Sequence, residues 1–281
     1  MRTLLSLLSF VSTLSASPIL FAISGDSFGI PRQLVQIDLT GQSAAPVVLL
    51  GDGSYSFAGG LAATGPVTFT GIRNDSGGNA ELVSFLSGGQ VSPVNTLLAG
   101  WFGGLALRSG IEYWIRNDAL GDAYLESSLG TSSAIGTGFT GGLAYRPEDG
   151  LFYAIGNDFL GNSTLYSISG GGAVAALPLT LGGGFYGGLA WDSASGYFYA
   201  IASDPFANST LYRFAPGDIT PTQLFALGQG YLHAALTVGL SDPAVPEPAG
   251  WMLAAAGIAA LGAGRRRGTR KRLSDKDNQI N

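Results

Sequence analysis

The sequence predicts an all-β body built from a repeated unit of four short strands. The chain has 281 residues, of which 44 are glycine and only 12% are charged, a composition typical of a β domain with many tight turns. A short motif recurs at intervals of about 44 residues, and each copy is followed by three further apolar runs. Four strands in about 44 residues is the period of a β-propeller blade. We therefore expect a β-propeller of four-stranded antiparallel blades.

The first element in chain order is a predicted signal peptide over residues 1–16. Met1 and Arg2 form a charged start, and the run TLLSLLSFVSTLSAS that follows is apolar and ends in small residues. This layout is typical of a secretory signal that is removed after export. The sequence favours cleavage after Ala16.

The repeated motif of the body begins with an aromatic residue and contains a pair of glycines. It reads FAGGLA from Phe57, WFGGLA from Trp101, FTGGLA from Phe139 and FYGGLA from Phe185, and a degenerate copy, YLHAAL, begins at Tyr231. In an alignment without gaps, His233 replaces the first glycine of the last copy. Small residues in an innermost strand let neighbouring blades approach each other near the axis.

The two ends of the body together predict a fifth blade. PILFAISGD from Pro18 matches a second strand, RQLVQIDL a third and PVVLLG a fourth, whereas the copy at 231–238 has only a first strand. We therefore predict five blades within residues 17–243, closed by pairing of the N- and C-terminal strands. A β-sandwich would not explain the fixed period. The stretch GGLAYRPEDGLFYAIGN also resembles secreted propeller repeats of the kelch and NHL type.

A short apolar segment follows the body. Pro246, Glu247 and Pro248 precede sixteen uncharged residues, Ala249 to Gly264, eleven of which are alanine or glycine; Arg265, Arg266 and Arg267 come next. As a helix this segment spans about 24 Å, less than the roughly 30 Å of a bilayer core. The arginines hold the C-terminus in the cytoplasm. The segment is therefore predicted to be a transient inner-membrane anchor.

Pro-Glu-Pro, a short apolar helix and an arginine cluster in this order resemble the PEP-CTERM sorting signal of bacterial exosortase substrates. The resemblance covers residues 244–267 and implies exosortase as a processing partner in a host that makes exopolysaccharide. It implies export through the inner membrane and a final place at the cell surface or outside the cell. The basic and polar cytoplasmic tail, residues 268–281, is longer than usual for that family. A permanent single-span anchor is the alternative.

The charge and composition of the body exclude several classes of function. Between Pro18 and Val245 the chain has six arginines, no lysine and sixteen acidic residues, a net charge of −10, which repels nucleic acid and anionic membranes. With no cysteine and a single histidine, it offers neither a thiol nucleophile nor a histidine-based zinc site. The pattern D-x-D-x-D-G of calcium loops is also absent. We expect no cofactor and no metal.

Two functional motifs match in sequence but not in their predicted structural context. Gly136–Gly141 and Gly182–Gly187 both fit the dinucleotide fingerprint, but a predicted strand follows each match where nucleotide binding needs a helix. Gly25-Asp26-Ser27-Phe28-Gly29 fits the nucleophile elbow, yet its serine occupies a hairpin position of the repeat, and His233 is the only histidine that could serve as its base.

Two sets of repeated residues are predicted to share one end of the propeller. We call the segment that leads from one blade into the first strand of the next blade the joint. Because successive strands alternate in direction, this joint and the turn after the second strand lie on the same face. The turns carry Asp26, Asp75, Asp118, Asp158 and Asp204, and the joints carry Phe57, Trp101, Phe139, Phe185 and Tyr231. Aromatic rings stack on sugars and carboxylates accept sugar hydroxyls, so this is the candidate ligand face. The alternative is that the aromatic residues pack between blades and that the aspartates only form turns.

The sequence favours a non-catalytic, exported propeller that binds surface glycan or exopolysaccharide. A secreted glycosidase is the first alternative, since such enzymes use two or three acids in a central funnel. Those acids differ from blade to blade, whereas the aspartates here recur in register. A structural matrix protein without a specific ligand is the second alternative.

Overall fold

The computed structural model describes residues 17–25, 30–51, 53–57, 59–75, 79–158, 160–184, 187–204, 206, 208–230 and 235–240. Contacts divide the chain into Met1–Leu240 and Ser241–Asn281, and the described residues all belong to the first unit. The predicted signal peptide and the whole sorting segment, with Pro246, Glu247, Pro248, Arg265, Arg266 and Arg267, lie outside them. Within the described ranges, no helix is long and apolar enough to span a membrane.

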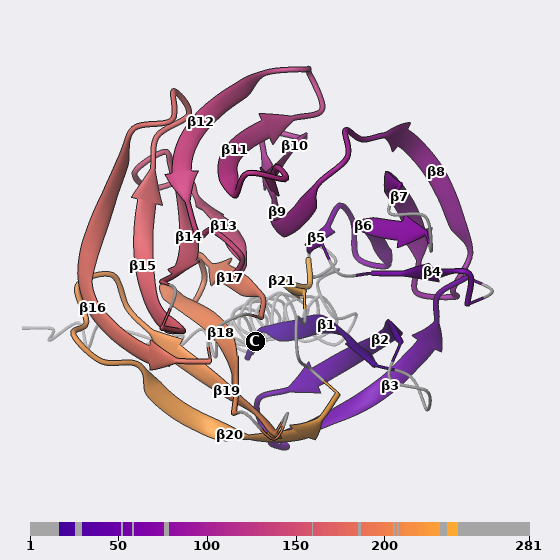
Figure 1. Cartoon of the computed structure of the whole chain (residues 1–281). Coiled ribbons are helices and arrows are strands. Elements are labelled where there is room, and N and C mark those ends of the chain that lie inside the picture. The colour runs from indigo at the N-terminus through magenta and orange to yellow at the C-terminus, as the bar shows by residue number, and fades with distance from the viewer. Residues whose placement is uncertain are drawn as a thin grey trace, which may run out of the picture. The chain divides into compact units, whose positions relative to one another are not determined.

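The described residues form five antiparallel sheets around a common axis (Figure 1). From the axis outward, blade 1 contains β21 (Leu236–Val238), β1 (Ile19–Gly25), β2 (Pro31–Asp38) and β3 (Ser43–Leu49). Blade 2 contains β5 (Leu61–Ala63) and the short β4 (Tyr55–Ser56), both paired with β6 (Thr68–Asp75), then β7 (Ala80–Leu86) and β8 (Val91–Thr96). Blade 3 contains β9 (Trp101–Arg108), β10 (Ile111–Asn117), β11 (Asp122–Ser127) and β12 (Ser132–Thr137).

The last two blades repeat this order. Blade 4 contains β13 (Leu143–Arg146), β14 (Leu151–Asn157), β15 (Asn162–Ile168) and β16 (Val174–Gly183). Blade 5 contains β17 (Leu189–Asp192), β18 (Tyr197–Ser203), β19 (Asn208–Phe214) and β20 (Thr222–Gln229). The predicted five-bladed propeller of four-stranded antiparallel blades is confirmed.

The ring is closed as the sequence predicts. The C-terminal strand β21 pairs with β1, with Leu20 opposite Val238, Phe21 opposite Thr237 and Ala22 opposite Leu236. Blade 1 is therefore built from both ends of the body. A second contact joins it to blade 2, because the backbone N–H of Ala63 donates to Oγ1 of Thr237 at 3.1 Å.

The apolar core lies between the blades. The second strands are buried on both sides, as in β14, where Phe152, Ala154 and Ile155 have no exposed surface. Their apolar residues are continuous because a neighbouring blade covers each face. The outermost strands are mostly exposed, as the burial pattern of β8 shows.

The second glycine of each described pair touches the next blade. A β-carbon on Gly104 would overlap the backbone nitrogen of Leu143, and one on Gly142 or Gly188 would overlap the equivalent nitrogen of Leu189 or Leu236. Only a residue without a side chain fits so close to a neighbouring backbone. The prediction that small residues let the blades approach at the axis is confirmed.

The fifth copy of the motif has one extra residue. Gly230 and Gly184 accept equivalent backbone hydrogen bonds from the second strands of their blades, at 2.7 and 2.8 Å, and so do Ala235 and Gly188, at 3.1 and 3.3 Å. Ala235 therefore comes five positions after Gly230, whereas Gly188 comes four positions after Gly184. The alignment without gaps was wrong here: Ala235 takes the place of a second glycine, and His233 lies outside the described residues.

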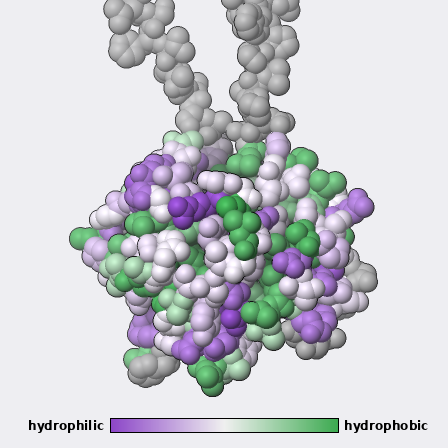
Figure 2. All heavy atoms as spheres, turned by 90° about the horizontal axis from the view of Figure 1, so that it is seen from above, coloured by the Kyte–Doolittle hydropathy of each residue, from purple (hydrophilic) through white to green (hydrophobic). Residues whose placement is uncertain are grey.

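The two ends of the propeller differ in what they carry. On the terminal face, Ile19 and Gly239 lie side by side, joined by a 2.7 Å hydrogen bond from the Gly239 N–H to the Ile19 carbonyl. The opposite end, which we call the joint face, carries the joints between blades and the hairpins between second and third strands. Seen from the side, polar and apolar side chains are interspersed over the described surface (Figure 2).

Candidate functional site

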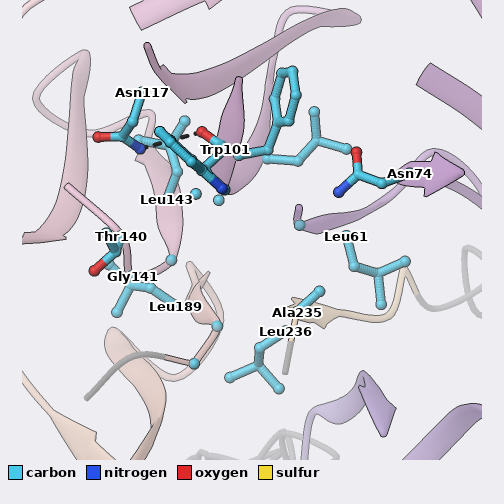
Figure 3. Close-up of a pocket in the computed structure, with 18 residues that line it drawn as sticks. Leu61, Asn74, Trp101, Asn117, Thr140, Gly141, Leu143, Leu189, Ala235 and Leu236 are labelled. Carbon is cyan, nitrogen blue, oxygen red and sulfur yellow. Dashed lines mark hydrogen bonds between the residues drawn. The ribbon is translucent and has the colours of Figure 1, made fainter. Parts of the chain in front are cut away.

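A pocket of about 340 Å³ lies at the centre of the ring and is lined by residues of all five blades. Its apolar wall includes one leucine from each blade, and these have at most 3% of their surface exposed: Leu61, Leu105, Leu143, Leu189 and Leu236. The paired glycines leave this space open, because none of them projects a side chain into it. Figure 3 shows Leu61, Leu143, Leu189 and Leu236 placed around the hollow.

Four described residues bring polar side-chain atoms to this pocket: Asn74, Trp101, Asn117 and Thr140. None of the described lining residues is charged. Asn74 is the penultimate residue of the second strand of blade 2 and Asn117 the last residue of that of blade 3, so they reach the axis from the joint face. The indole of Trp101 lies at the edge of the hollow in Figure 3.

Asn117 connects blade 3 to blade 4. Its Nδ2 donates to the carbonyl of Phe139 at 2.9 Å and to that of Trp101 at 3.3 Å. Thr140 is also engaged, since its Oγ1 accepts a 2.8 Å hydrogen bond from Asn157. These residues fix the shape of the pocket wall.

Asn74 is different from these neighbours. Its Oδ1 is buried and has no hydrogen-bond partner in the structure. A buried acceptor without a donor costs free energy of about 1–3 kcal/mol, and such groups are rare in native proteins. In Figure 3 the side chain of Asn74 extends toward the hollow.

The predicted ring of stacking aromatic residues needs correction. Phe57 is 1% exposed and Phe139 is 3% exposed, so neither can stack on a ligand, whereas Trp101 is 65% exposed. Phe57 packs edge-on against Phe85 with ring centroids 5.7 Å apart, and Phe139 packs against Tyr166 at 5.1 Å. Phe185 and Tyr231 lie outside the described residues. Of the described members, only Trp101 has the exposure that the predicted role requires.

The reason lies in the strands. In blade 3, β9 pairs with β10 as far as Trp101 opposite Asn117, so alternation turns Phe102 inward and Trp101 outward. In blade 4 the inner strand starts only at Leu143. Phe139 therefore lies in an irregular joint and turns into the core.

The predicted acidic ring is a set of turn residues. Oδ1 of Asp158 accepts the backbone N–H groups of Leu160 and Asn162 at 2.9 and 2.8 Å, and Oδ2 accepts Nδ2 of Asn162 at 2.9 Å. Asp204 repeats this arrangement with Asn208, and Asp75 makes the same two bonds to Asn79. The interpretation as residues that bond their own turn is confirmed.

The two remaining members of the acidic ring complete this account. Asp118 accepts from Leu120 and Asp122, at 2.9 and 3.0 Å. Asp26 lies outside the described residues. The described aspartates are therefore needed for hairpin geometry whether or not a ligand touches them.

These hydrogen bonds perturb the acidity of two aspartates. The side-chain bond from Asn162, followed by its backbone N–H, holds the pKa of Asp158 below the ordinary value of 3.8, and Asn208 does the same for Asp204. A carboxyl whose pKa is lower in the folded than in the unfolded state stabilises the fold above the unfolded pKa. That contribution is lost as the pH falls through the folded pKa.

We predict that replacing Asp158 and Asp204 together by asparagine will reduce the fall of the melting temperature at acid pH. Asparagine can accept the turn N–H groups but does not titrate, so the variant should lose less of its melting temperature between pH 6 and pH 3. The measurement is thermal melting of both proteins at the two pH values. An equal fall in both would contradict this role of the carboxylates.

The same hairpins display apolar side chains that the sequence did not single out. Leu120, Leu160 and Phe206 are 88%, 72% and 79% exposed. Each lies two residues after an aspartate of the turn and donates its backbone N–H to that aspartate. The turns therefore fix the backbone that carries these three exposed apolar side chains.

Sequence reasoning missed the central pocket and the role of Asn74 and Asn117. A signal was present, because IRND occurs at Ile72–Asp75 and again at Ile115–Asp118. From the sequence alone, a role is predicted only for the aspartate of this motif. Within the described residues there is no group of three or more histidine, cysteine or acidic residues that could hold a metal ion.

No protein-family model matches the chain, and no curated protein is similar to it in sequence. Solved structures are similar in fold. TolB from Acinetobacter baumannii has a TM-score of 0.50 at 12% identity, and the match covers 75% of this chain and 53% of that one. The chain thus spans about half the length of that TolB.

Two further structures match with lower scores. A protein assigned as TolB from Agrobacterium tumefaciens has a TM-score of 0.47 at 12% identity, with 81% of this chain and all of that chain covered. A protein assigned as a 6-phosphogluconolactonase from Bacteroides uniformis has a TM-score of 0.37 at 12% identity, with 76% and 68% covered. At 12% identity, the likeness to the TolB of Acinetobacter baumannii shows the β-propeller fold alone.

Proposed function

We propose that this protein is an exported, non-catalytic propeller that binds glycan, such as exopolysaccharide, at the cell surface or in the extracellular matrix. The observation that carries the proposal is the exposed ring of Trp101 at the edge of an uncharged central pocket. A large flat apolar ring beside amide groups suits a sugar, which has apolar C–H faces and polar hydroxyls.

The lining of the pocket favours binding over hydrolysis. A glycosidase of the usual kind needs two carboxylates flanking the scissile bond. No described residue that lines the pocket is acidic, and the described aspartates of the joint face are held in their turns. These observations support a binding role over the glycosidase alternative.

Retention on polysaccharide tests this function. We expect the full-length chain to be retained on the host's own exopolysaccharide, or on another glycan of a panel, without releasing new reducing ends. Retention and reducing ends are measured on the same immobilised material. Failure to bind any glycan would reject the proposal, and release of reducing ends would favour the glycosidase.

The sorting proposal rests on the sequence of residues 244–267. The positions of the termini and of Trp101 in the body are compatible with it. The described chain begins and ends at the terminal face, where Gly239 bonds to Ile19, and Trp101 lies at the opposite, joint face. A body attached through its C-terminal segment would have its attachment point and its pocket at opposite ends. This arrangement suits a surface protein whose ligand lies away from the membrane.

We predict that exosortase processing near Pro246-Glu247-Pro248 removes the arginine cluster and the tail. Mass spectrometry of the protein recovered from the cell surface or medium should show no peptide from residues 265–281. Replacing Pro246, Glu247 and Pro248 by alanine should leave those peptides in place. Intact tails on most molecules of the unaltered protein would instead indicate a permanent anchor.

A further inference from the structure

We infer that the central pocket is the primary glycan site and that it takes a single, uncharged sugar ring. This inference rests on the proposed function and makes it more specific. It replaces the predicted platform of five aromatic residues by one tryptophan, one free acceptor and an apolar wall.

The size of the pocket indicates one ring. Its volume of about 340 Å³ lies at the lower end of the range for small-molecule sites, about 300–1,000 Å³. All five blades contribute to the wall, so a second ring would extend beyond the pocket onto the joint face.

The polar groups of the pocket call for a ligand that donates hydrogen bonds. Oδ1 of Asn74 is buried and has no partner, and a turn of this side chain toward the pocket would bring the acceptor within reach of a ligand hydroxyl. The amide of Asn117 and the hydroxyl of Thr140 are already bonded to the wall. Asn74 is therefore the group with the most to gain from a sugar hydroxyl.

Trp101 supplies the apolar contact. Its side chain is 65% exposed, so stacking a sugar on it removes apolar surface from water without disturbing the core. Its backbone is fixed by pairing with Asn117 in blade 3. The ring is thus held on a rigid strand, which limits the ordering cost of binding.

Charge selects against acidic sugars. No described residue lining the pocket is a cation, and burying a carboxylate without a partner is costly. The hairpins of the joint face add Asp75, Asp118, Asp122, Asp158 and Asp204 around it, and the body has a net charge of −10 from six arginines and sixteen acids. A uronic acid or sulfated sugar would be repelled as well as desolvated.

Matched pairs of monosaccharides test the inference on the full-length chain. The probes are glucose, galactose and mannose, each compared with its uronic acid, which differs only at C6. Binding is measured by calorimetry and by the shift in tryptophan fluorescence. We expect at least one hexose to bind and to compete with polysaccharide, and its uronic acid to bind at least tenfold more weakly.

Four variants locate the site. Trp101→Ala and Asn74→Ala should each weaken hexose binding at least tenfold, whereas Trp101→Phe should retain most of it. Leu120→Ala is the control, since this exposed residue of the joint face does not line the pocket. Thermal melting of each variant confirms that the fold survives.

The outcomes separate this inference from the proposed function. Retention on polysaccharide that Trp101→Ala leaves unchanged, or a uronic acid that binds as tightly as its hexose, would overturn the inference while leaving glycan binding in place elsewhere. Absence of binding to every sugar and polysaccharide would reject both.

Discussion

Replacing Gly104 by alanine should lower the melting temperature of the propeller by about 6–12 °C. A β-carbon at this position would overlap the backbone nitrogen of Leu143 in the next blade. Overpacking costs about 1–3 kcal/mol and sometimes more, and the upper value applies here because a backbone cannot rotate away as a side chain can. In a domain of about 200 residues, each kcal/mol shifts the melting temperature by roughly 2–4 °C.

The control for this variant is Gly88→Ala. Gly88 lies in the hairpin between β7 and β8, a β-carbon there would meet nothing within 4 Å, and its φ is not in the left-handed region. Its replacement should leave melting unchanged or raise it slightly, because alanine reduces the entropy of the unfolded chain. Equal melting of the Gly104 and Gly88 variants would mean that the blades do not touch at the axis.

One copy of the motif has alanine at the position of the second glycine. Ala235 takes the place of a second glycine in blade 1 and is 3% exposed. The one-residue insertion before it, between Gly230 and Ala235, distinguishes this copy from that of blade 5. Ala235 therefore places a methyl group where the other described copies have a glycine.

The blade architecture could be predicted because the repeat encodes backbone contacts directly. Four of the five copies of the motif carry a glycine pair, which permits the close approach of neighbouring blades, so its recurrence indicates both the period and the position of the axis. The turn aspartates could be predicted for the same reason, since Asp158 and Asn162 bond only to their own hairpin.

The exposure of the aromatic residues could not be predicted, because it depends on strand length. Trp101 and Phe139 occupy the same place in the repeat, yet β9 begins at Trp101 whereas β13 begins only at Leu143. Relative to the motif, β13 begins four residues later than β9, and this difference in strand pairing decides which way the aromatic side chain points. The pocket was missed for a related reason: the lone acceptor of Asn74 is evident only once all five blades surround it.

Truncating the chain after Gly230 should open the ring, whereas truncating it after Leu240 should not. The shorter protein loses β21, which pairs with β1 from Ala22 to Leu20, so the inner edge of blade 1 is left with unpaired N–H and C=O groups. It also loses Leu236, which is 3% exposed and packs against Leu20 and Ala22, a loss of core contact of about 2–5 kcal/mol by analogy with leucine-to-alanine changes. Exposed strand edges pair with other molecules, so we expect the protein ending at Gly230 to aggregate and to melt at a lower temperature.

The protein ending at Leu240 keeps every described strand and should stay monomeric, with the same melting temperature as the intact body. Light scattering and thermal melting of the two proteins decide the matter, and a monomeric, equally stable protein ending at Gly230 would show that pairing of β21 with β1 does not hold the ring closed.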